Sequence, residues 1–277
     1  MEKLFLPVRI LDRRWAEKFV EGEIFMRSLS EFGTWNRLIN KDDLNLANSF
    51  RGDLSEGATK NVSNPNEDDF FKLLPDELKK HIKSGKIMDD ADIQYFNLLC
   101  FYCLYFNATN NNFEKPSKDI KKFGDTAVII TNMDIFLNRL LERVERNEKY
   151  AFLINPIKYY SEEKTKNLNP LFNKSKFYSW QNELRIAVGR LDENNKLSNG
   201  NYPIIQSTKP LVLNVGSLRD ITITVSTDDF INGVWKASNL FLADSNNDLS
   251  LLKIAMQQTN KIMANYQSNK SRYTFDI

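Results

Sequence analysis

Histidine and cysteine are scarce in this chain of 277 residues, which contains one histidine, His81, and two cysteines, Cys100 and Cys103. A catalytic triad that uses histidine would depend on His81, which lies in a polar stretch with no nucleophile motif beside it. The cysteines form a Cys-x-x-Cys pattern, but their apolar surroundings predict a buried strand, on which an odd offset puts the two side chains on opposite faces. Zinc would need two further ligands. The prediction is therefore that both thiols are reduced, buried and free of metal.

Long apolar runs and glycine-rich phosphate loops are also lacking. No run approaches the roughly 20 apolar residues of a membrane-spanning helix, so we expect no membrane association. The ten glycines form no loop of the P-loop or Rossmann type, which argues against dinucleotide binding of the dehydrogenase kind. Residues 1–7 are too few and too soon charged for a signal peptide. A cytoplasmic protein is therefore expected.

The composition that remains is that of a globular protein. Nineteen Phe and ten Tyr supply enough aromatic side chains for a sizeable core. A net charge of +2 neither favours nor excludes nucleic acid as a partner. Strand-like and helix-like patterns alternate irregularly, which predicts a mixed α+β fold in a single domain over residues 1–277. Strands are expected at 4–10, 23–29, 94–106, 126–131, 150–160, 177–190, 211–215 and 220–225, helices at 12–21, 67–83, 132–144 and 247–267, and a long loop that suits a lid at 30–66.

The most informative stretch is residues 180–185, which read Trp-Gln-Asn-Glu-Leu-Arg. Alternation of period two from Phe177 to Val188 predicts a strand, on which Gln181 and Glu183 share a face. A carboxylate can stabilise an oxocarbenium-like centre, and a neighbouring amide can orient an acceptor. The alternative is an exposed strand face with a cross-strand salt bridge.

Polar residues at the ends of two earlier strands extend this pattern. Arg9 ends the first expected strand, and Ser28 and Ser30 end the second. Together with Gln181 and Glu183, this Arg, Ser, Gln-x-Glu order resembles the ADP-ribosyltransferase superfamily, in particular the branch named for Arg-Ser-Glu. The chain departs from it by having Ser-Leu-Ser where the superfamily usually has Ser-Thr-Ser.

A second resemblance covers the N-terminal two-thirds of the chain. It is similar to an uncharacterised group of bacterial and phage proteins that share a Val-Arg-Ile start, a Gly-x-Ile-Phe-Met-x-Ser-Leu strand, a Gly-Asp-x-x-Glu-Gly loop and a late Gln-x-Glu-x-Arg-Ile strand. Proteins of this type are often toxins or phage-conflict proteins, which makes a cognate antitoxin a candidate partner.

The resemblance to the ADP-ribosyltransferases implies mixed sheets that form a central cleft with flanking helices. It also implies a mono-ADP-ribosyltransferase that cleaves NAD and transfers ADP-ribose to a macromolecule, either protein or nucleic acid. Glu183 would be catalytic at the ribose 2′-hydroxyl, and Gln181 would face the acceptor. Arg9 would bind the pyrophosphate bidentately, and Ser28 or Ser30 would contact the ribose.

Each further assignment has an alternative. Tyr178 and Trp180 would contact nicotinamide or the acceptor, or else serve as core or lid aromatics. Lys174 and Lys176 could add positive charge for a phosphate-bearing substrate, and Arg9 could instead pair with Asp12. The rival function is a non-catalytic binding or inhibitor protein that retains the fold. A basic surface, or only solvated charge, is expected from Arg13, Arg14, Lys18, Lys261, Lys270 and Arg272.

Overall fold

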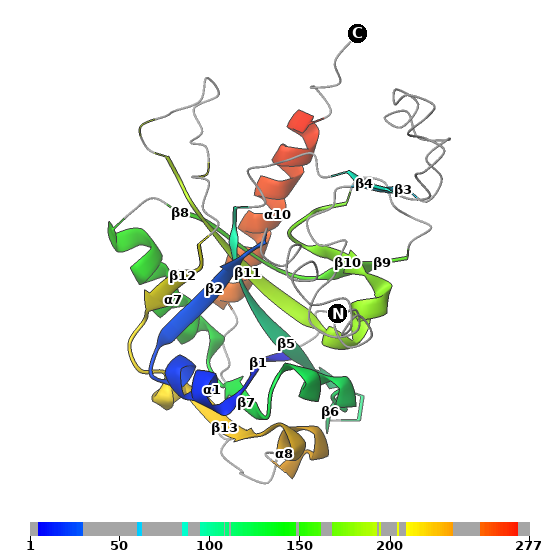
Figure 1. Cartoon of the computed structure of the whole chain (residues 1–277), viewed down its shortest axis with the longest axis vertical. Coiled ribbons are helices and arrows are strands. Elements are labelled where there is room, and N and C mark those ends of the chain that lie inside the picture. Colours follow the sequence, from blue (N-terminus) through cyan, green and yellow to red (C-terminus); the bar gives the residue numbers. More distant parts are fainter. Residues whose placement is uncertain are drawn as a thin grey trace, which may run out of the picture.

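The computed structural model combines a large antiparallel sheet with several helices, which confirms the predicted α+β class (Figure 1). It describes residues 5–29, 60–62, 85–87, 95–107, 109–110, 112–147, 150–161, 168–192, 194, 204, 209–234 and 250–270. The expected helix at 67–83, Ser30, His81 and most of the expected loop at 30–66 lie outside these ranges.

Nine of the described strands form one sheet, in which every pairing is antiparallel. They are β1 (Phe5–Leu11), β2 (Glu23–Ser28), β5 (Asn97–Asn107), β6 (Asn112–Phe113), β7 (Thr126–Ile130), β8 (Tyr150–Pro156), β11 (Glu183–Arg190), β12 (Leu211–Asn214) and β13 (Thr222–Ser226). Two short pairs lie apart from it: β3 (Lys60–Val62) with β4 (Gly85–Ile87), and β9 (Lys158–Tyr160) with β10 (Asn173–Ser175).

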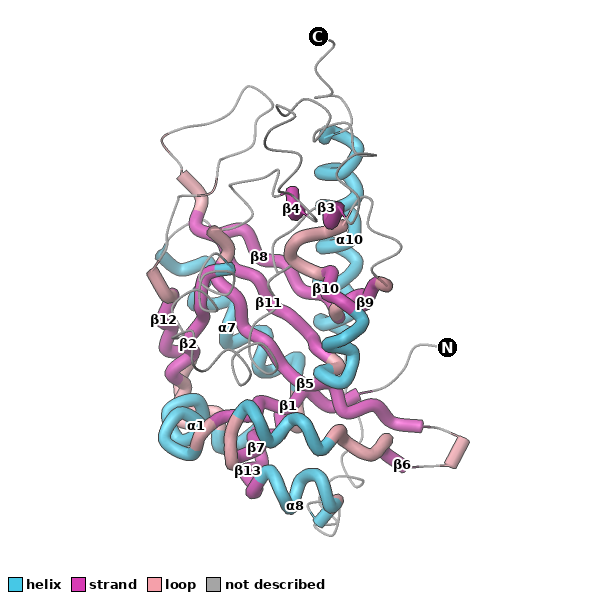
Figure 2. Tube along the Cα trace, turned by 45° about the vertical axis from the view of Figure 1, so that its right-hand side comes forward, coloured by secondary structure: helices cyan, strands magenta, loops and turns pink. Residues whose placement is uncertain are grey.

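Strand β5 is the hub of the sheet, because β1, β2, β6 and β11 all pair with it (Figure 2). Strand β1 pairs with β5 from Tyr102 to Tyr105 and then continues beside β7, whereas β2 pairs with β5 at Asn97 and Leu98. Cys100 lies between these two paired stretches. The sheet therefore opens at Cys100, and the cavity described below is built around this position.

Helices α1 (Arg13–Val20) and α7 (Met133–Asn147) contribute apolar faces to the main core. The carboxamide oxygen of Asn132 accepts a hydrogen bond from the N–H of Ile135 at 3.0 Å, which caps the start of α7. Asp12 precedes α1 but makes no side-chain cap hydrogen bond. The remaining short helices are η3 (Lys118–Phe123), η4 (Lys176–Gln181), η5 (Arg219–Ile221) and α8 (Thr227–Asn232).

The long helix α10 (Ser250–Lys270) covers the edge of the sheet formed by β8. Strand β8 ends at Pro156, a residue typical of edge strands, and among the described strands it pairs with β11 alone. The hydroxyl of Thr259 accepts a hydrogen bond from the edge N–H of Ile154 at 2.8 Å. Ile262, farther along α10, is 50% exposed. Within the described ranges, no helix is long and apolar enough to cross a membrane.

The contact between Thr259 and Ile154 generates the first prediction. Thr259→Val keeps the side-chain shape but removes the acceptor of a buried N–H, which should lower the free energy of unfolding by about 1–3 kcal/mol. Urea unfolding measures this change. The exposed Thr224→Val on β13 is the matched control and should change stability by less than about 0.5 kcal/mol. Equal effects of the two substitutions would contradict the proposed closure of the sheet edge by α10.

Candidate functional site

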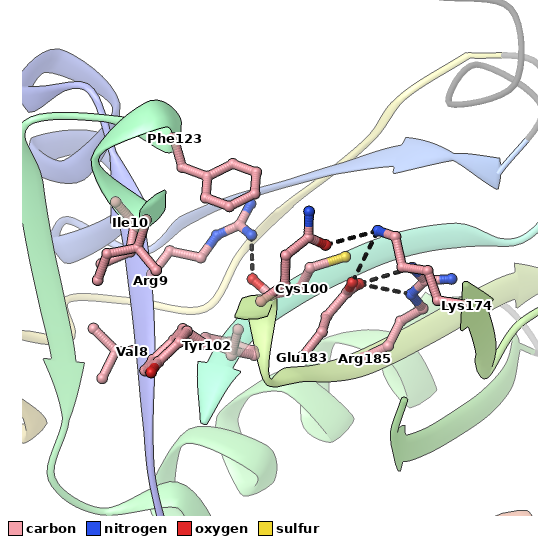
Figure 3. A pocket seen from close by; sticks show the side chains of 12 residues that line it. Val8, Arg9, Ile10, Cys100, Tyr102, Phe123, Lys174, Glu183 and Arg185 are labelled. Carbon is pink, nitrogen blue, oxygen red and sulfur yellow. Dashed lines mark hydrogen bonds and ion pairs between the residues drawn. The ribbon is translucent and has the colours of Figure 1, made fainter. Parts of the chain in front are cut away.

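A cavity of about 100 Å³ lies where β1, β5 and β11 meet η3, η4 and β10 (Figure 3). Small-molecule pockets usually begin at roughly 300 Å³, so this space would hold only part of a nucleotide-sized ligand. The described residues that line the cavity are Val8, Arg9, Ile10, Cys100, Phe101, Tyr102, Ile120, Phe123, Lys174, Gln181, Glu183 and Arg185.

The carboxylate of Glu183, the first residue of β11, is the centre of a buried polar network. Its Oε1 accepts from Nε and Nη2 of Arg185 at 2.9 and 2.8 Å, and its Oε2 accepts from Nζ of Lys174 at 3.2 Å. The thiol of Cys100 also hydrogen-bonds this carboxylate. A carboxylate offers about four lone-pair positions, so donors of the chain itself occupy its full acceptor capacity.

The network sets the ionisation of both acidic groups. Burial alone would raise the pKa of Glu183, but the nearby charges of Arg185 and Lys174 outweigh it and lower that pKa to about 2. Burial, together with the Glu183 charge, raises the pKa of Cys100 to about 12. Glu183 is therefore a carboxylate at neutral pH, and Cys100 is a protonated donor rather than a nucleophile.

Backbone contacts fix the position of this network. The N–H of Glu183 donates to the hydroxyl of Tyr159 on β9 at 2.9 Å. Nη1 of Arg185 donates to the carbonyl of Leu171 at 2.8 Å, and the Arg185 side chain is only 1% exposed. Glu183 is thus held through its main chain and its side chain together.

The segment before Glu183 differs from the predicted strand. Residues Lys176–Gln181 form the 3₁₀ helix η4, whose first turn is capped by Ser175, with Oγ accepting from the N–H of Phe177 at 3.4 Å. Asn182 then adopts a left-handed conformation with φ 40°, which asparagine tolerates better than most residues. The prediction that Gln181 and Glu183 share a strand face was therefore wrong.

Gln181 and Glu183 nevertheless converge, because Lys174 binds both. Its Nζ donates to Oε1 of Gln181 at 2.9 Å as well as to Glu183. In a 3₁₀ helix, side chains three apart lie above one another, and Tyr178 and Gln181 form the buried side of η4. The ring centroid of Tyr178 lies 5.2 Å from Nζ of Lys174. Tyr178 thus supports Lys174 and is not among the cavity-lining residues.

Trp180 also lies one layer behind the cavity. Its ring stacks on Phe123, which lines the cavity, with centroids 5.5 Å apart and planes inclined by 29°. Nζ of Lys122 lies 5.7 Å from the Trp180 ring centroid. Trp180 therefore shapes the wall through Phe123.

Arg9 reaches the cavity from β1. Alternate residues of a strand direct their backbone groups to the same edge of that strand. The carbonyl of Phe96 accepts a hydrogen bond from the N–H of Leu29, just after the end of β2, and therefore points to the β2 edge. The carbonyl of Cys100 points to that same edge, between β1 and β2, where Nη1 of Arg9 donates to it. Within the described part of the chain, Nε of Arg9 is buried without a hydrogen-bond partner. Its guanidinium thus bonds β5, which disfavours the alternative pairing with Asp12.

The structure does not bring Ser28 to this cavity. Alternation along β2 places Ser28 on the same buried face as Ile24 and Met26, which belong to the main core. Ser30 lies outside the described residues. The expected ribose contact from Ser28 is therefore wrong for the cavity that Arg9 and Glu183 share.

Three parts of the network were not assigned from the sequence: the roles of Arg185, Cys100 and Tyr159. Arg185 is two residues after Glu183 on one strand, a spacing that could have identified it. Cys100 was correctly predicted to face away from Cys103, which packs in the main core, but it is only half-buried. The described residues contain no cluster of three or more metal-ligating side chains.

Comparison of the chain with protein-family models, with curated proteins and with solved structures finds no match. The geometry of the cavity and the resemblance of its motifs therefore carry the functional argument.

The lowered pKa of Glu183 generates a prediction about acid stability. Because the folded-state pKa is below the unfolded one, the Glu183 ion pairs stabilise the protein fully above about pH 5, and this contribution is lost as the pH falls towards 2. It is on the order of 3 kcal/mol. Urea unfolding at several pH values should show a shallower rise of the unfolding free energy from pH 2 to 5 in Glu183→Gln. Identical pH profiles for the two proteins would show that Glu183 is not held as an ionised group.

Proposed function

We propose that the protein is an NAD-dependent mono-ADP-ribosyltransferase with an ADP-ribosyltransferase-like fold. The observation that carries the proposal is that Arg9 on β1 and Glu183 on β11, far apart in the sequence, line one cavity together with Gln181. The divergence of β1 and β2 from β5 supports the proposed cleft. A role in the cytoplasm as a toxin or phage-conflict protein, with a cognate antitoxin, rests on the resemblance of the sequence alone.

The proposed reaction uses the charge of Glu183. The bond between ribose C1′ and the nicotinamide nitrogen breaks, and its electron pair leaves with neutral nicotinamide. A lone pair of the acceptor forms the new bond to C1′, and the acceptor loses a proton. An ionised Glu183 beside the ribose would bond the 2′-hydroxyl and stabilise the positive charge that develops on the ring.

Binding of the ribose requires that Glu183 release one of its present donors. Arg185 holds Oε1 through two short bonds, and its own side chain is fixed by Leu171. Lys174 has a flexible stem and a longer contact of 3.2 Å, and the thiol of Cys100 is a weak donor. The proposed ligand thus displaces Lys174 or Cys100 from the carboxylate, while Arg185 stays in place.

Arg9 is the proposed contact for the pyrophosphate of NAD. A planar guanidinium suits two phosphate oxygens, and Nε of Arg9 has no partner among the described residues. Among the described lining residues, the three cations Arg9, Lys174 and Arg185 accompany a single carboxylate. This excess of positive charge favours an anionic ligand.

The second candidate is a non-catalytic binding or inhibitor protein with the same fold. Two observations favour it: the acceptor capacity of Glu183 is filled by the chain itself, and the cavity measures only about 100 Å³. Release of nicotinamide from NAD by the purified protein distinguishes the two functions, because only the transferase breaks the glycosidic bond.

For catalysis, Glu183→Gln is the decisive change. It keeps the shape of the side chain but removes its charge, so nicotinamide release should fall roughly 100-fold or more, while NAD affinity changes little. The exposed Glu17→Gln on α1 is the matched control. Assays run below the melting temperature of each variant separate a catalytic effect from unfolding. An unchanged rate in Glu183→Gln would rule out the proposed role of the carboxylate.

For NAD binding, Arg9→Ala should act differently from Glu183→Gln. The pyrophosphate contact is present in the ground state and the transition state alike, so the KM for NAD should rise roughly tenfold or more with a smaller change in kcat. Arg13→Ala, at an exposed arginine of α1, is the control. A lower kcat with an unchanged KM would place Arg9 at the reacting centre instead.

A further inference from the structure

The carboxamide of Gln181 has a fixed polarity. Its oxygen accepts a hydrogen bond from Nζ of Lys174 at 2.9 Å. An ammonium group has three donors and no acceptor, so the amide nitrogen cannot occupy that position. The nitrogen therefore points away from Lys174. Gln181 thus offers a ligand two N–H donors, whereas one lone pair of its oxygen is already taken by Lys174.

The other polar groups of the cavity have the same character. Nε of Arg9 is a donor without a partner among the described residues, and Lys174 and Arg185 are cations. Of the lining residues that the structure describes, Glu183 is the one with an acidic side chain, and its lone pairs are in use. A group that enters beside Gln181 therefore meets mainly donors and positive charge, which favours an acceptor. A guanidinium, which is a cation and only donates, is disfavoured there.

The outer side of η4 has a different composition. Phe177 and Trp180 are three residues apart, so in a 3₁₀ helix they lie on the same side, about 120° around the axis from the buried Tyr178 and Gln181. Phe177 is 66% exposed, Lys176 beside it is also exposed, and Trp180 is half-buried against Phe123. The outer face of η4 thus combines one exposed aromatic ring with a neighbouring cation, whereas Lys122, which lies over Trp180, is paired with Asp119.

We infer that the acceptor of ADP-ribose is a base of single-stranded nucleic acid. This inference rests on the proposed transferase function. Exposed aromatic rings with neighbouring cations bind single strands by stacking bases and attracting phosphates. Phe177 stacks a base, Lys176 attracts the backbone, and a carbonyl or ring nitrogen of the target base accepts from Gln181. A nitrogen or oxygen of that base bonds to C1′, nicotinamide leaves with the electron pair, and the base loses a proton.

The first experiment measures binding without NAD, by fluorescence anisotropy of a short labelled single-stranded RNA or DNA of mixed sequence. Phe177→Ala should weaken binding by about 5- to 100-fold, the range for loss of one stacked base. Trp15 is the control, because it is a second exposed aromatic, 38% exposed, with Arg14 and Lys18 over its ring. Loss of binding in Trp15→Ala, with Phe177→Ala unchanged, would move the surface to α1 and overturn the inference, as would absence of binding.

The second experiment tests the polarity of Gln181. Gln181→Glu retains the oxygen that Lys174 binds but replaces both donors with a negative charge. The ratio of ADP-ribose transferred to an oligonucleotide over nicotinamide released should fall roughly tenfold or more. Gln258→Glu makes the same change at an exposed site on α10 and should leave the ratio unaltered. An equal or higher ratio in Gln181→Glu would overturn the inference.

The outcomes separate this inference from the transferase proposal. Nicotinamide release with transfer to proteins alone would overturn the nucleic-acid inference and leave the transferase standing. Oligonucleotide binding through Phe177 without any nicotinamide release would overturn the transferase, and with it the acceptor role, and would leave a nucleic-acid-binding protein.

Discussion

The buried ion pairs of Glu183 are the interaction on which the rest of the site depends. Removing one partner would leave a charge without compensation in a region where side chains are almost fully buried. Hydrogen bonds to the main chain hold these charges in place. Arg185 donates to a carbonyl of the 168–172 segment, and the Tyr159 hydroxyl accepts from the N–H at the start of β11. Strands β9, β10 and β11 are thereby held in one arrangement around a single carboxylate. Polar contacts, more than apolar packing, define this corner of the molecule.

The sequence alone predicted the parts of the fold in which one periodicity dominates. Strands β1, β2, β5 and β7 and helix α7 lie within a few residues of their expected positions, since their apolar faces are uninterrupted. The convergence of Arg9 and Glu183 on one cavity was also predicted, through a family resemblance rather than through periodicity. No local pattern could show that β5 would connect the strands that carry these two residues.

The errors have specific physical causes. Apolar and polar residues alternate from Phe177 to Gln181 as they would in a strand, but Ser175 caps a 3₁₀ turn and Asn182 accepts a positive φ. Ser28 was assigned to the site from its position at the end of β2. Side chains along β2 alternate between two faces, and this alternation places Ser28 on the face that is buried in the core. Lys174 was expected only as a source of positive charge, because its contact with Glu183 depends on how β10 pairs with β9.

The left-handed residue Asn182 separates two pieces of chain whose surroundings differ. On one side lies η4, whose outer face is exposed, and on the other lies β11, whose register is fixed by β5 and β8. Substitutions at Phe177 or Ser179 can alter the first piece without shifting the second. Under the proposed function, natural variation could therefore change which partner the protein modifies while the bond-breaking carboxylate stays where it is.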